Sequence, residues 1–313
     1  PTIFTGGNID TFGDGSFGTR GNINVVVPNG AVTAYTNATW TGFQSLTEEL
    51  SVNSTFVTDY ITYKVTSTSP ATVEVTDYNT TGGTVVNIPE TVTSICSKSY
   101  TVTEIGLGAF EGNNLTAITI PSSITNIKNN AFNQNQFTSI IIPENVTNIG
   151  NLAFGVNNLS AVVVLGATPP TIATGGGNDT FANSSRPNIN LVITNNTTDE
   201  YVTDNGALWT GFKMVFEATS PTTAEVSNYD PANGTNVVIP ASVIAGSTVF
   251  DVTKIDNSAF ENIGLTSVTI PNSVTDIGIS AFELNNLTSV TIPDSVTNIG
   301  TTAFATNSIT NLS

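Results

Sequence analysis

Alanine–phenylalanine pairs recur at a constant offset of 22, and this spacing constrains the fold of the chain more than any other feature. The pairs fall in two blocks, at Ala109-Phe110, Ala131-Phe132 and Ala153-Phe154, and at Ala259-Phe260, Ala281-Phe282 and Ala303-Phe304. Other apolar positions keep the same step, for example Leu115, Phe137 and Leu159. A repeat this short cannot bury its own apolar side chains. The spacing therefore predicts coils that stack into a solenoid and share one core.

The coil at residues 287–304 shows how each repeat is built, and it reads LTSVTIPDSVTNIGTTAF. Its leucine, valine and isoleucine have the spacing of a leucine-rich repeat strand, which Pro293 ends. No part of the coil has a helical period of useful length. We expect a β-rich solenoid with coils about 4.8 Å apart. Its phenylalanines should form a column, and its asparagines should form ladders that bond the turn backbones, at Asn113, Asn135 and Asn157, or at Asn126 and Asn148.

A second, longer repeat divides the chain into two tandem units. Residues 2–12 match residues 171–181 at an offset of 169, whereas Pro70 to Tyr78 match Pro221 to Tyr229 at an offset of 151. The change of offset means that the first copy holds an insertion, at residues 44–61, that the second copy lacks. Because both ends of the chain fall inside a unit, we expect it to be an excerpt of a longer array.

The two repeats together predict seven segments. They are the closing segment of a preceding unit (1–43), an insertion or linker (44–61), the β lead-in of unit 1 (62–105), the leucine-rich repeat coils of unit 1 (106–168), its closing segment (169–212), the β lead-in of unit 2 (213–255) and the truncated coils of unit 2 (256–313). The lead-in strands should pair as hairpins that cover the first edge of each coil block. A short helix beginning near Thr197 should carry Tyr201 and Trp209 over the open end of unit 1.

Composition argues against several classes of function. The chain has 24 acidic and 7 basic residues, a net charge of −17, which disfavours nucleic acid and anionic membranes as partners. Histidine is absent and Cys96 is the single cysteine, so no Ser-His-Asp or Cys-His site and no intrachain disulfide can form. Carboxylate pairs at Glu48-Glu49 and Asp199-Glu200 lie where an insertion or a helix terminus accounts for them. We predict a protein that is not an enzyme and has no cofactor.

Calcium is the weaker interpretation of one acidic loop. Asp10 and Asp14 lie among glycines in an oxygen-rich stretch. Asp10 recurs as Asp179 in the second copy, but Asn183 replaces Asp14, and the spacing is not that of an EF-hand. A solvated loop is the favoured alternative.

The exposed face of the stacked strands is the candidate binding face. Its predicted members alternate with the inward leucine, valine and isoleucine side chains and are Thr116, Thr119, Thr138, Ser139, Thr266, Ser267, Thr269, Thr288, Ser289 and Thr291. Ile141 and Val163 interrupt the polar column in the first block. Threonine also simply suits an exposed strand, which is the plainer explanation. The functional alternative is weak, multivalent adhesion through many shallow contacts.

The coil pattern LTSVTIPxSVTxIGxxAFxxNN closely resembles the BspA-type (Treponema-type) leucine-rich repeat, although these coils look about one residue shorter than the usual family pattern. The Thr168-Pro-Pro-Thr171 segment and the Trp209-Thr-Gly-Phe212 ending resemble a closing segment of such bacterial surface proteins. The resemblance implies a secreted or surface-anchored protein that adheres to host or neighbouring-cell proteins or glycans, without catalytic residues to carry over.

Two hypotheses of function remain open on the sequence. In the first, the chain is a segment of an extracellular or cell-surface repeat adhesin that binds proteins, glycans or cells. In the second, it is a structural stalk or filament component, with self-association in an array as its mode of assembly. No membrane insertion is expected in this segment, because no apolar run has the length of a span.

Overall fold

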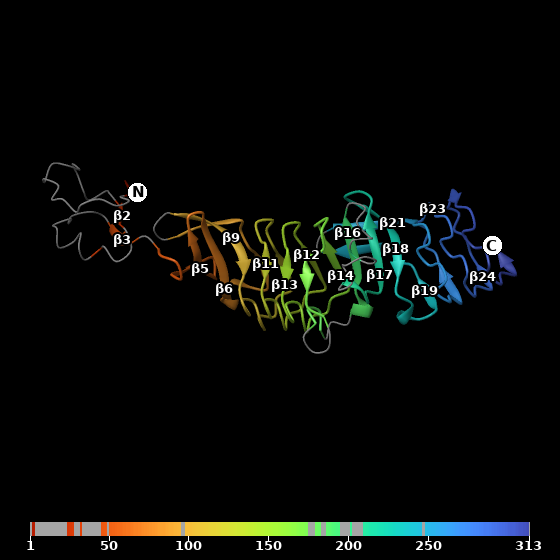
Figure 1. Cartoon of the computed structure of the whole chain (residues 1–313), viewed down its shortest axis with the longest axis horizontal. Coiled ribbons are helices and arrows are strands. Elements are labelled where there is room, and N and C mark those ends of the chain that lie inside the picture. The colour runs from red at the N-terminus through yellow and green to blue at the C-terminus, as the bar shows by residue number, and fades with distance from the viewer. Residues whose placement is uncertain are drawn as a thin grey trace.

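The computed structural model describes residues 2–3, 24–27, 32, 45–48, 50–94, 98–174, 179–182, 186–194, 201, 209–245 and 248–312. Its strands stack along one axis from β4 to β26 as an elongated rod (Figure 1). The predicted β-rich solenoid is confirmed. Within the described residues, helical structure amounts to the 3-10 turns Thr80–Gly82, Arg186–Asn188 and Pro231–Asn233 and to Val32, Tyr201 and Trp209.

The first unit winds its coils between two sheets. One sheet has the order β15-β13-β11-β9-β6-β5-β4, with β8 paired to β9. The strands are β4 (Thr55–Thr58), β5 (Ile61–Thr68), β6 (Ala71–Tyr78), β8 (Thr91–Thr93), β9 (Ser99–Ile105), β11 (Asn126–Ile127), β13 (Asn148–Ile149) and β15 (Thr171–Ile172). The opposite side carries β7 (Val85–Asn87), β10 (Ala117–Thr119), β12 (Ser139–Ile142) and β14 (Ala161–Val164).

The lead-in strands were predicted to form hairpins, and most of them do, but parallel pairs also join these strands to one another and to the coils. β5 and β6 do pair antiparallel, but β6 pairs parallel with β9, and β7 pairs parallel with β10. The lead-in is therefore already a coil of the solenoid, with a short hairpin of β8 and β9 inserted into it. The register pairs Val85 with Ala117, which lie more than 22 residues apart. The spacing of the Ala-Phe pairs therefore does not reveal this first coil.

Stacked aromatic rings run through each coil block, as the repeated phenylalanines predicted. Phe110, Phe132 and Phe154 are fully buried, and consecutive ring centroids lie 5.4 and 5.3 Å apart. The second block repeats this at 5.1 Å for Phe260, Phe282 and Phe304. Tyr78 and Tyr229 begin the two columns at 5.6 and 5.8 Å. Parallel rings at this separation add dispersion and quadrupole attraction to the burial of each side chain.

An asparagine ladder ties the turns of neighbouring coils together. The Asn157 amide donates to the carbonyl oxygens of Phe132, Phe154 and Gly155 at 3.0–3.1 Å, and its oxygen accepts from the Phe137 amide. The same pattern recurs at Asn135, Asn285 and Asn307. Asn148 donates to the Asn126 side chain at 2.9 Å, so these two residues bond each other across neighbouring strands and do not bond turn backbones as predicted.

The first position of the predicted ladder differs. The Asn113 side-chain oxygen is buried without a hydrogen-bond partner among the described residues. The coil before Asn113 turns through the 3-10 segment Thr80–Gly82 instead of the usual turn. The backbone amide that would donate to the Asn113 oxygen is that of Gly83, and it already donates to the Thr80 carbonyl.

The two units are joined through one shared sheet, which the sequence did not indicate. Its order is β12-β14-β16-β17-β18-β21-β23-β25, with β20 paired to β21. The new strands are β16 (Asn190–Thr194), β17 (Met214–Ala218), β18 (Thr223–Tyr229), β20 (Ser242–Ala245), β21 (Thr248–Ile255), β23 (Asp276–Ile277) and β25 (Asn298–Ile299). The remaining side of unit 2 has β19 (Asn236–Val238), β22 (Ser267–Thr269), β24 (Ser289–Val290) and β26 (Asn311–Leu312).

Strands β14, β16 and β17 of the shared sheet are buried on both faces. On β14, Val162 and Val164 point into the core of unit 1, whereas Ala161 and Val163 belong to the core of unit 2. On β17, Val215 faces the first core and Phe216 the second. Burial of both faces makes the junction part of the hydrophobic core.

The start of the chain arranges the corresponding strands differently. Its described strands β1 (Thr2–Ile3), β2 (Asn24–Val27) and β3 (Ser45–Glu48) form a separate parallel sheet. β17 corresponds to β3 at an offset of 169 and to β5 at an offset of 151. The insertion thus separates two strands that are one strand in unit 2, and its β4 pairs with β5.

The end of unit 1 is closed by aromatic side chains. The Tyr201 hydroxyl donates to the Gly166 carbonyl at 2.6 Å, and the Trp209 indole donates to the Pro170 carbonyl at 2.8 Å. Phe181 stacks on Phe154 and continues the column. Tyr201 is the only described residue between 195 and 208, so the rest of the predicted helix lies outside the described residues. So do Cys96 and the residues Tyr35 and Trp40, which were expected to play the part of Tyr201 and Trp209 in the first copy.

We predict that replacing one ladder asparagine destabilises the rod far more than replacing its neighbour. Asn157→Ala removes three buried hydrogen bonds to carbonyl oxygens and leaves the buried Phe137 amide without its acceptor, and it should lower the free energy of unfolding by about 3 kcal/mol. Asn158→Ala removes an exposed contact to Gln136 and should cost less than about 0.5 kcal/mol. Denaturant unfolding followed by circular dichroism measures both, and equal costs would contradict the role of the ladder.

Candidate functional site

The predicted binding face lies on strands whose outward side chains are mostly exposed. In unit 1, Thr116, Thr119 and Thr138 are exposed and Ser139 is half-buried. In unit 2 all six predicted residues are exposed: Thr266, Ser267, Thr269, Thr288, Ser289 and Thr291. Several hydroxyls bond the neighbouring coil, as Thr266 does to Thr235 at 3.1 Å. The hydroxyls are thus partly used within the solenoid.

The two halves of this face are not parts of one sheet. The shared sheet joins β12 and β14 of unit 1 to β18, β21, β23 and β25, which correspond to β6, β9, β11 and β13. The hydroxyl-bearing side of unit 1 is thereby continuous with the other side of unit 2. The ten predicted residues therefore form two separate patches, four in unit 1 and six in unit 2.

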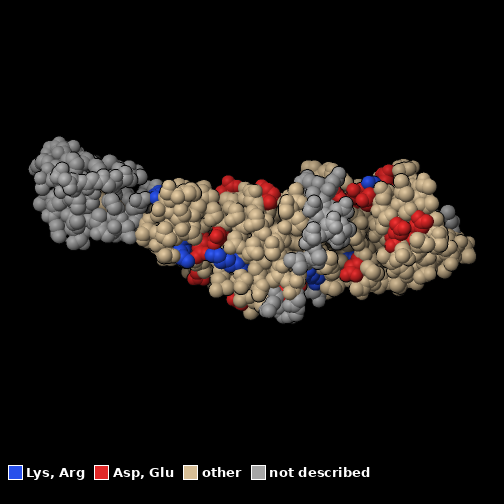
Figure 2. Space-filling view, in the orientation of Figure 1, with Lys and Arg blue, Asp and Glu red and all other residues tan. Residues whose placement is uncertain are grey.

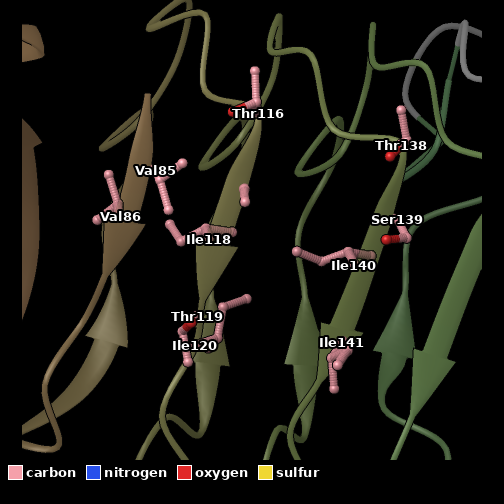
Figure 3. A pocket seen from close by; sticks show the side chains of 11 residues that line it. Val85, Val86, Thr116, Ile118, Thr119, Ile120, Thr138, Ser139, Ile140 and Ile141 are labelled. Carbon is pink, nitrogen blue, oxygen red and sulfur yellow. The ribbon is translucent and has the colours of Figure 1, made fainter. Parts of the chain in front are cut away.

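In unit 1 the four residues surround a crevice between β10 and β12 (Figure 3). The crevice encloses about 420 Å³ and is also lined by Val85, Ile118, Ile140 and Ile141. It forms because β10 pairs with β7, and β12 pairs with β14, while β10 and β12 share no ladder. Sequence reasoning did not identify this crevice, since the coils on either side of it have the same residue pattern as the others.

The interruption of the polar column by two aliphatic residues, noted in the sequence without an explanation, has a structural cause. Ile141 and Val163 replace polar residues in the outward column, and the structure places Val163 at 1% exposure in the core of unit 2. Ile141 packs against the same cluster, and Thr291, its counterpart on unit 2, is exposed. The interruption of the polar column thus marks where the second unit packs against the first.

Charged side chains gather in a few clusters on a surface that is otherwise uncharged (Figure 2). In unit 1, Glu74 accepts from Lys64 at 2.7 Å and from Lys128 at 2.5 Å, and Lys128 also contacts Glu104 at 2.7 Å. Burial opposes ionisation of Glu74, but the hydrogen bonds and charges of Lys128 and Lys64 outweigh it and hold its pKa below 4.5.

The corresponding cluster in unit 2 carries more negative charge. Glu225 stands where Glu74 stands in unit 1, and its cross-strand neighbour is Glu217 in place of Lys64. Lys254 contacts Glu225 at 2.5 Å and Asp256 at 3.6 Å. Burial raises the pKa of Glu225 above 4.5, and the carboxylates of Asp256 and Glu217 add to this against the opposing effect of Lys254.

Of the acidic residues in the calcium hypothesis, only Asp179 is described, and its carboxylate has other partners. Asp179 forms an ion pair with Arg186 at 2.8 Å and accepts a hydrogen bond from the Phe181 amide at 2.8 Å. Asp10, Asp14 and Asn183 lie outside the described residues. Among the residues that the structure describes, no group of three or more carboxylate or cysteine side chains is placed to hold a metal ion.

The described part of the chain contains no helix long and apolar enough to cross a membrane.

A family model described as "BspA type Leucine rich repeat region" matches six copies of its repeat at residues 91–206 and 237–313, more than half of the chain. No curated protein matches the chain.

Solved structures with some likeness include pneumococcal vaccine antigen PcpA, at 17% identity over 80% of this chain and 78% of that one, with a TM-score of 0.38. A leucine-rich cell surface protein from Faecalibacterium prausnitzii is 17% identical over 84% of this chain and 95% of its own, with a TM-score of 0.25. A leucine-rich repeat protein from Bacteroides capillosus is 28% identical over 32% and 92%, with a TM-score of 0.27. At TM-scores this low, the family assignment rests on the repeat match alone.

We predict opposite pH effects for the two equivalent glutamates. Because the pKa of Glu74 is lowered on folding, its ion pairs stabilise the protein above pH 4.5, and this stabilisation is lost as pH falls through the lowered pKa. Glu74→Gln should therefore cost about 2 kcal/mol at pH 7 and little in acid.

The pKa of Glu225 is raised on folding, so the folded state binds its proton more tightly. This group then adds stability as pH falls toward 4.5, and Glu225→Gln should not lower stability at pH 7. Unfolding free energies of both variants across pH 3–7 test this, and equal losses at pH 7 would contradict it.

Proposed function

The chain belongs to the BspA-type leucine-rich repeat family, and from this premise we propose that it is a segment of an extracellular or cell-surface repeat adhesin. In this proposal the solenoid face, and no catalytic centre, carries the function. Its partners are proteins or glycans on host or neighbouring cells.

The observation that carries the proposal is the regular, uncharged hydroxyl surface. Thr116 and Thr138 occupy the same position on successive coils, and Thr266 and Thr288 repeat it in unit 2. In a chain with a net charge of −17, the strands β10, β12, β22 and β24 carry no charged residue. Identical shallow contacts favour weak individual binding that becomes strong when many engage at once.

The extracellular location follows from the family's typical setting and stays a proposal for this chain. A single cysteine leaves the fold independent of disulfide chemistry, because its stability comes from coil stacking. The protein would thus be equally stable in oxidising and reducing surroundings.

The test uses the full chain on beads, presented to arrays of matrix proteins and glycans and to cells. Beads bearing many copies should adhere, and the soluble monomer should compete poorly. The double variant Thr116→Lys with Thr138→Lys places charges on the face and should reduce bead retention at least about tenfold, or about 1.4 kcal/mol.

The matched control carries the same two charges on the same coils. Thr125→Lys with Thr147→Lys changes exposed threonines that precede β11 and β13 on the other sheet. It should adhere like the unmodified chain. Loss in the control alone, or absence of adhesion at every bead density, would rule out binding through this face.

A structural stalk is the second candidate, and the shared sheet favours it. Because β14, β16 and β17 are buried on both faces, bending between the units would disrupt both cores. A stalk requires this stiffness. Val163→Asp places a charge in that junction, and we expect it to introduce a separate unfolding transition and greater bending in small-angle scattering. An unchanged scattering profile and a single transition would argue against the stalk.

A further inference from the structure

The crevice between β10 and β12 has a floor and a rim of different chemistry. Ile118 and Ile140 form the floor, while Thr119 and Ile141 stand at the rim (Figure 3). Ala117 also lines the crevice and is exposed. Ile140 is 2% exposed, whereas Ile118 is only partly buried because the crevice opens onto it. An aliphatic surface thus lies at the bottom of a slot between two parallel strands.

The crevice exists because the strands of neighbouring coils pair differently on the two sides of the rod. On the opposite side, β9, β11, β13 and β15 pair without a break. On this side the ladder stops between β10 and β12 and resumes at β14. The facing edges of two extended strands therefore border the crevice.

The lining selects against most ligand classes. All eleven residues that border the crevice are aliphatic or carry a hydroxyl, with no charged and no aromatic side chain among them. Sugar rings are usually held by aromatic faces and by carboxylate or amide groups, and charged ligands need an opposite charge. An aliphatic floor with hydroxyl groups at its rim fits the alternating side chains of an uncharged extended strand.

The chain itself already binds an extended strand beside the crevice. Strand β20 of unit 2 contacts β12 and β14 of unit 1. The outward side chains beneath this contact, Ile141 and Val163, are aliphatic and belong to the junction between the units. Ile141 also lines the crevice, so the crevice continues a surface that one strand already covers.

We propose that the crevice binds an extended, uncharged polypeptide segment, which inserts an aliphatic side chain between Ile118 and Ile140 and runs along β12. This rests on the proposed binding function of the face and specifies the kind of partner. The mode is recognition of an extended strand at a sheet edge, with one pocket providing selectivity.

The second unit supplies an internal comparison. Its ladder stops at the same place, between β22 and β24. There Val85, Ala117 and Ile141 are replaced by Asn236, Ser267 and Thr291, so the equivalent surface is polar. We therefore expect the first unit to bind the segment and the second to bind it weakly.

The experiment uses the isotopically labelled full chain and three capped hexapeptides as probes, alternating valine with threonine, isoleucine with serine, and leucine with glutamine. We expect saturable shifts of backbone amide resonances confined to β7, β10 and β12 with at least one of them. The variant Ala117→Tyr fills the crevice from an exposed position and should weaken binding at least about tenfold. Ser267→Tyr, the equivalent change in unit 2, should leave the affinity unchanged.

A second variant tests the lining without filling the space. Val85→Asn with Ile141→Thr copies the residues of unit 2 and should also weaken binding while leaving the thermal unfolding midpoint within a few degrees. Equal affinity in all variants, or no shifts with any of the three peptides, would overturn the proposal. Shifts in the crevice with maltohexaose and none with the peptides would overturn the choice of a polypeptide.

The bead experiment distinguishes failure of the crevice proposal from failure of the proposed adhesive function. If beads bearing Ala117→Tyr still adhere like the unmodified chain while Thr116→Lys with Thr138→Lys abolishes adhesion, then the face binds and the crevice is not its peptide site. If neither variant matters and the beads do not adhere at all, the proposed function itself is wrong.

Discussion

Stacking of one coil on the next is the interaction on which the rest of this structure depends. A single coil exposes its phenylalanine and leaves its turn carbonyls without donors unless a neighbour covers it. The neighbour supplies a parallel ring at 5.1–5.4 Å and an asparagine amide that bonds carbonyls of both coils. Ring stacking, burial and hydrogen bonding therefore all depend on the same distance between neighbouring coils.

The shared sheet joins two similar units so that their corresponding surfaces differ in burial and in composition. The outward position that is Thr119 on the first coil becomes Ile141 and Val163 where unit 2 packs on unit 1. The same sheet places the hydroxyl-bearing strands of the units on separate sheets. An adhesive face built from such units is therefore divided into patches, and each patch can differ in detail, as the aliphatic crevice of unit 1 does.

Charge is distributed so that the strands of the candidate face carry none. Acids and lysines meet on β5, β6, β9 and β11 of unit 1 and on their counterparts in unit 2, where ion pairs partly compensate for burial. Glu225 faces Glu217 across the strands where Glu74 faces Lys64, and burial, together with the carboxylates of Asp256 and Glu217, raises the pKa of Glu225. Duplicated units have thus kept their packing residues and diverged in their surface charge.

The sequence alone determined the solenoid, the phenylalanine columns and most of the asparagine ladder, because a constant residue count places identical side chains in register whatever surrounds them. It also showed that Ile141 and Val163 interrupt the polar column, but the structure supplied the reason, which is the packing of unit 2 on unit 1. Only the tertiary structure decided that the lead-in is itself a coil, that the units share a sheet, and that the ladder breaks between β10 and β12. Pairing between strands far apart in sequence depends on how whole coils tilt and splay, and no local spacing records that.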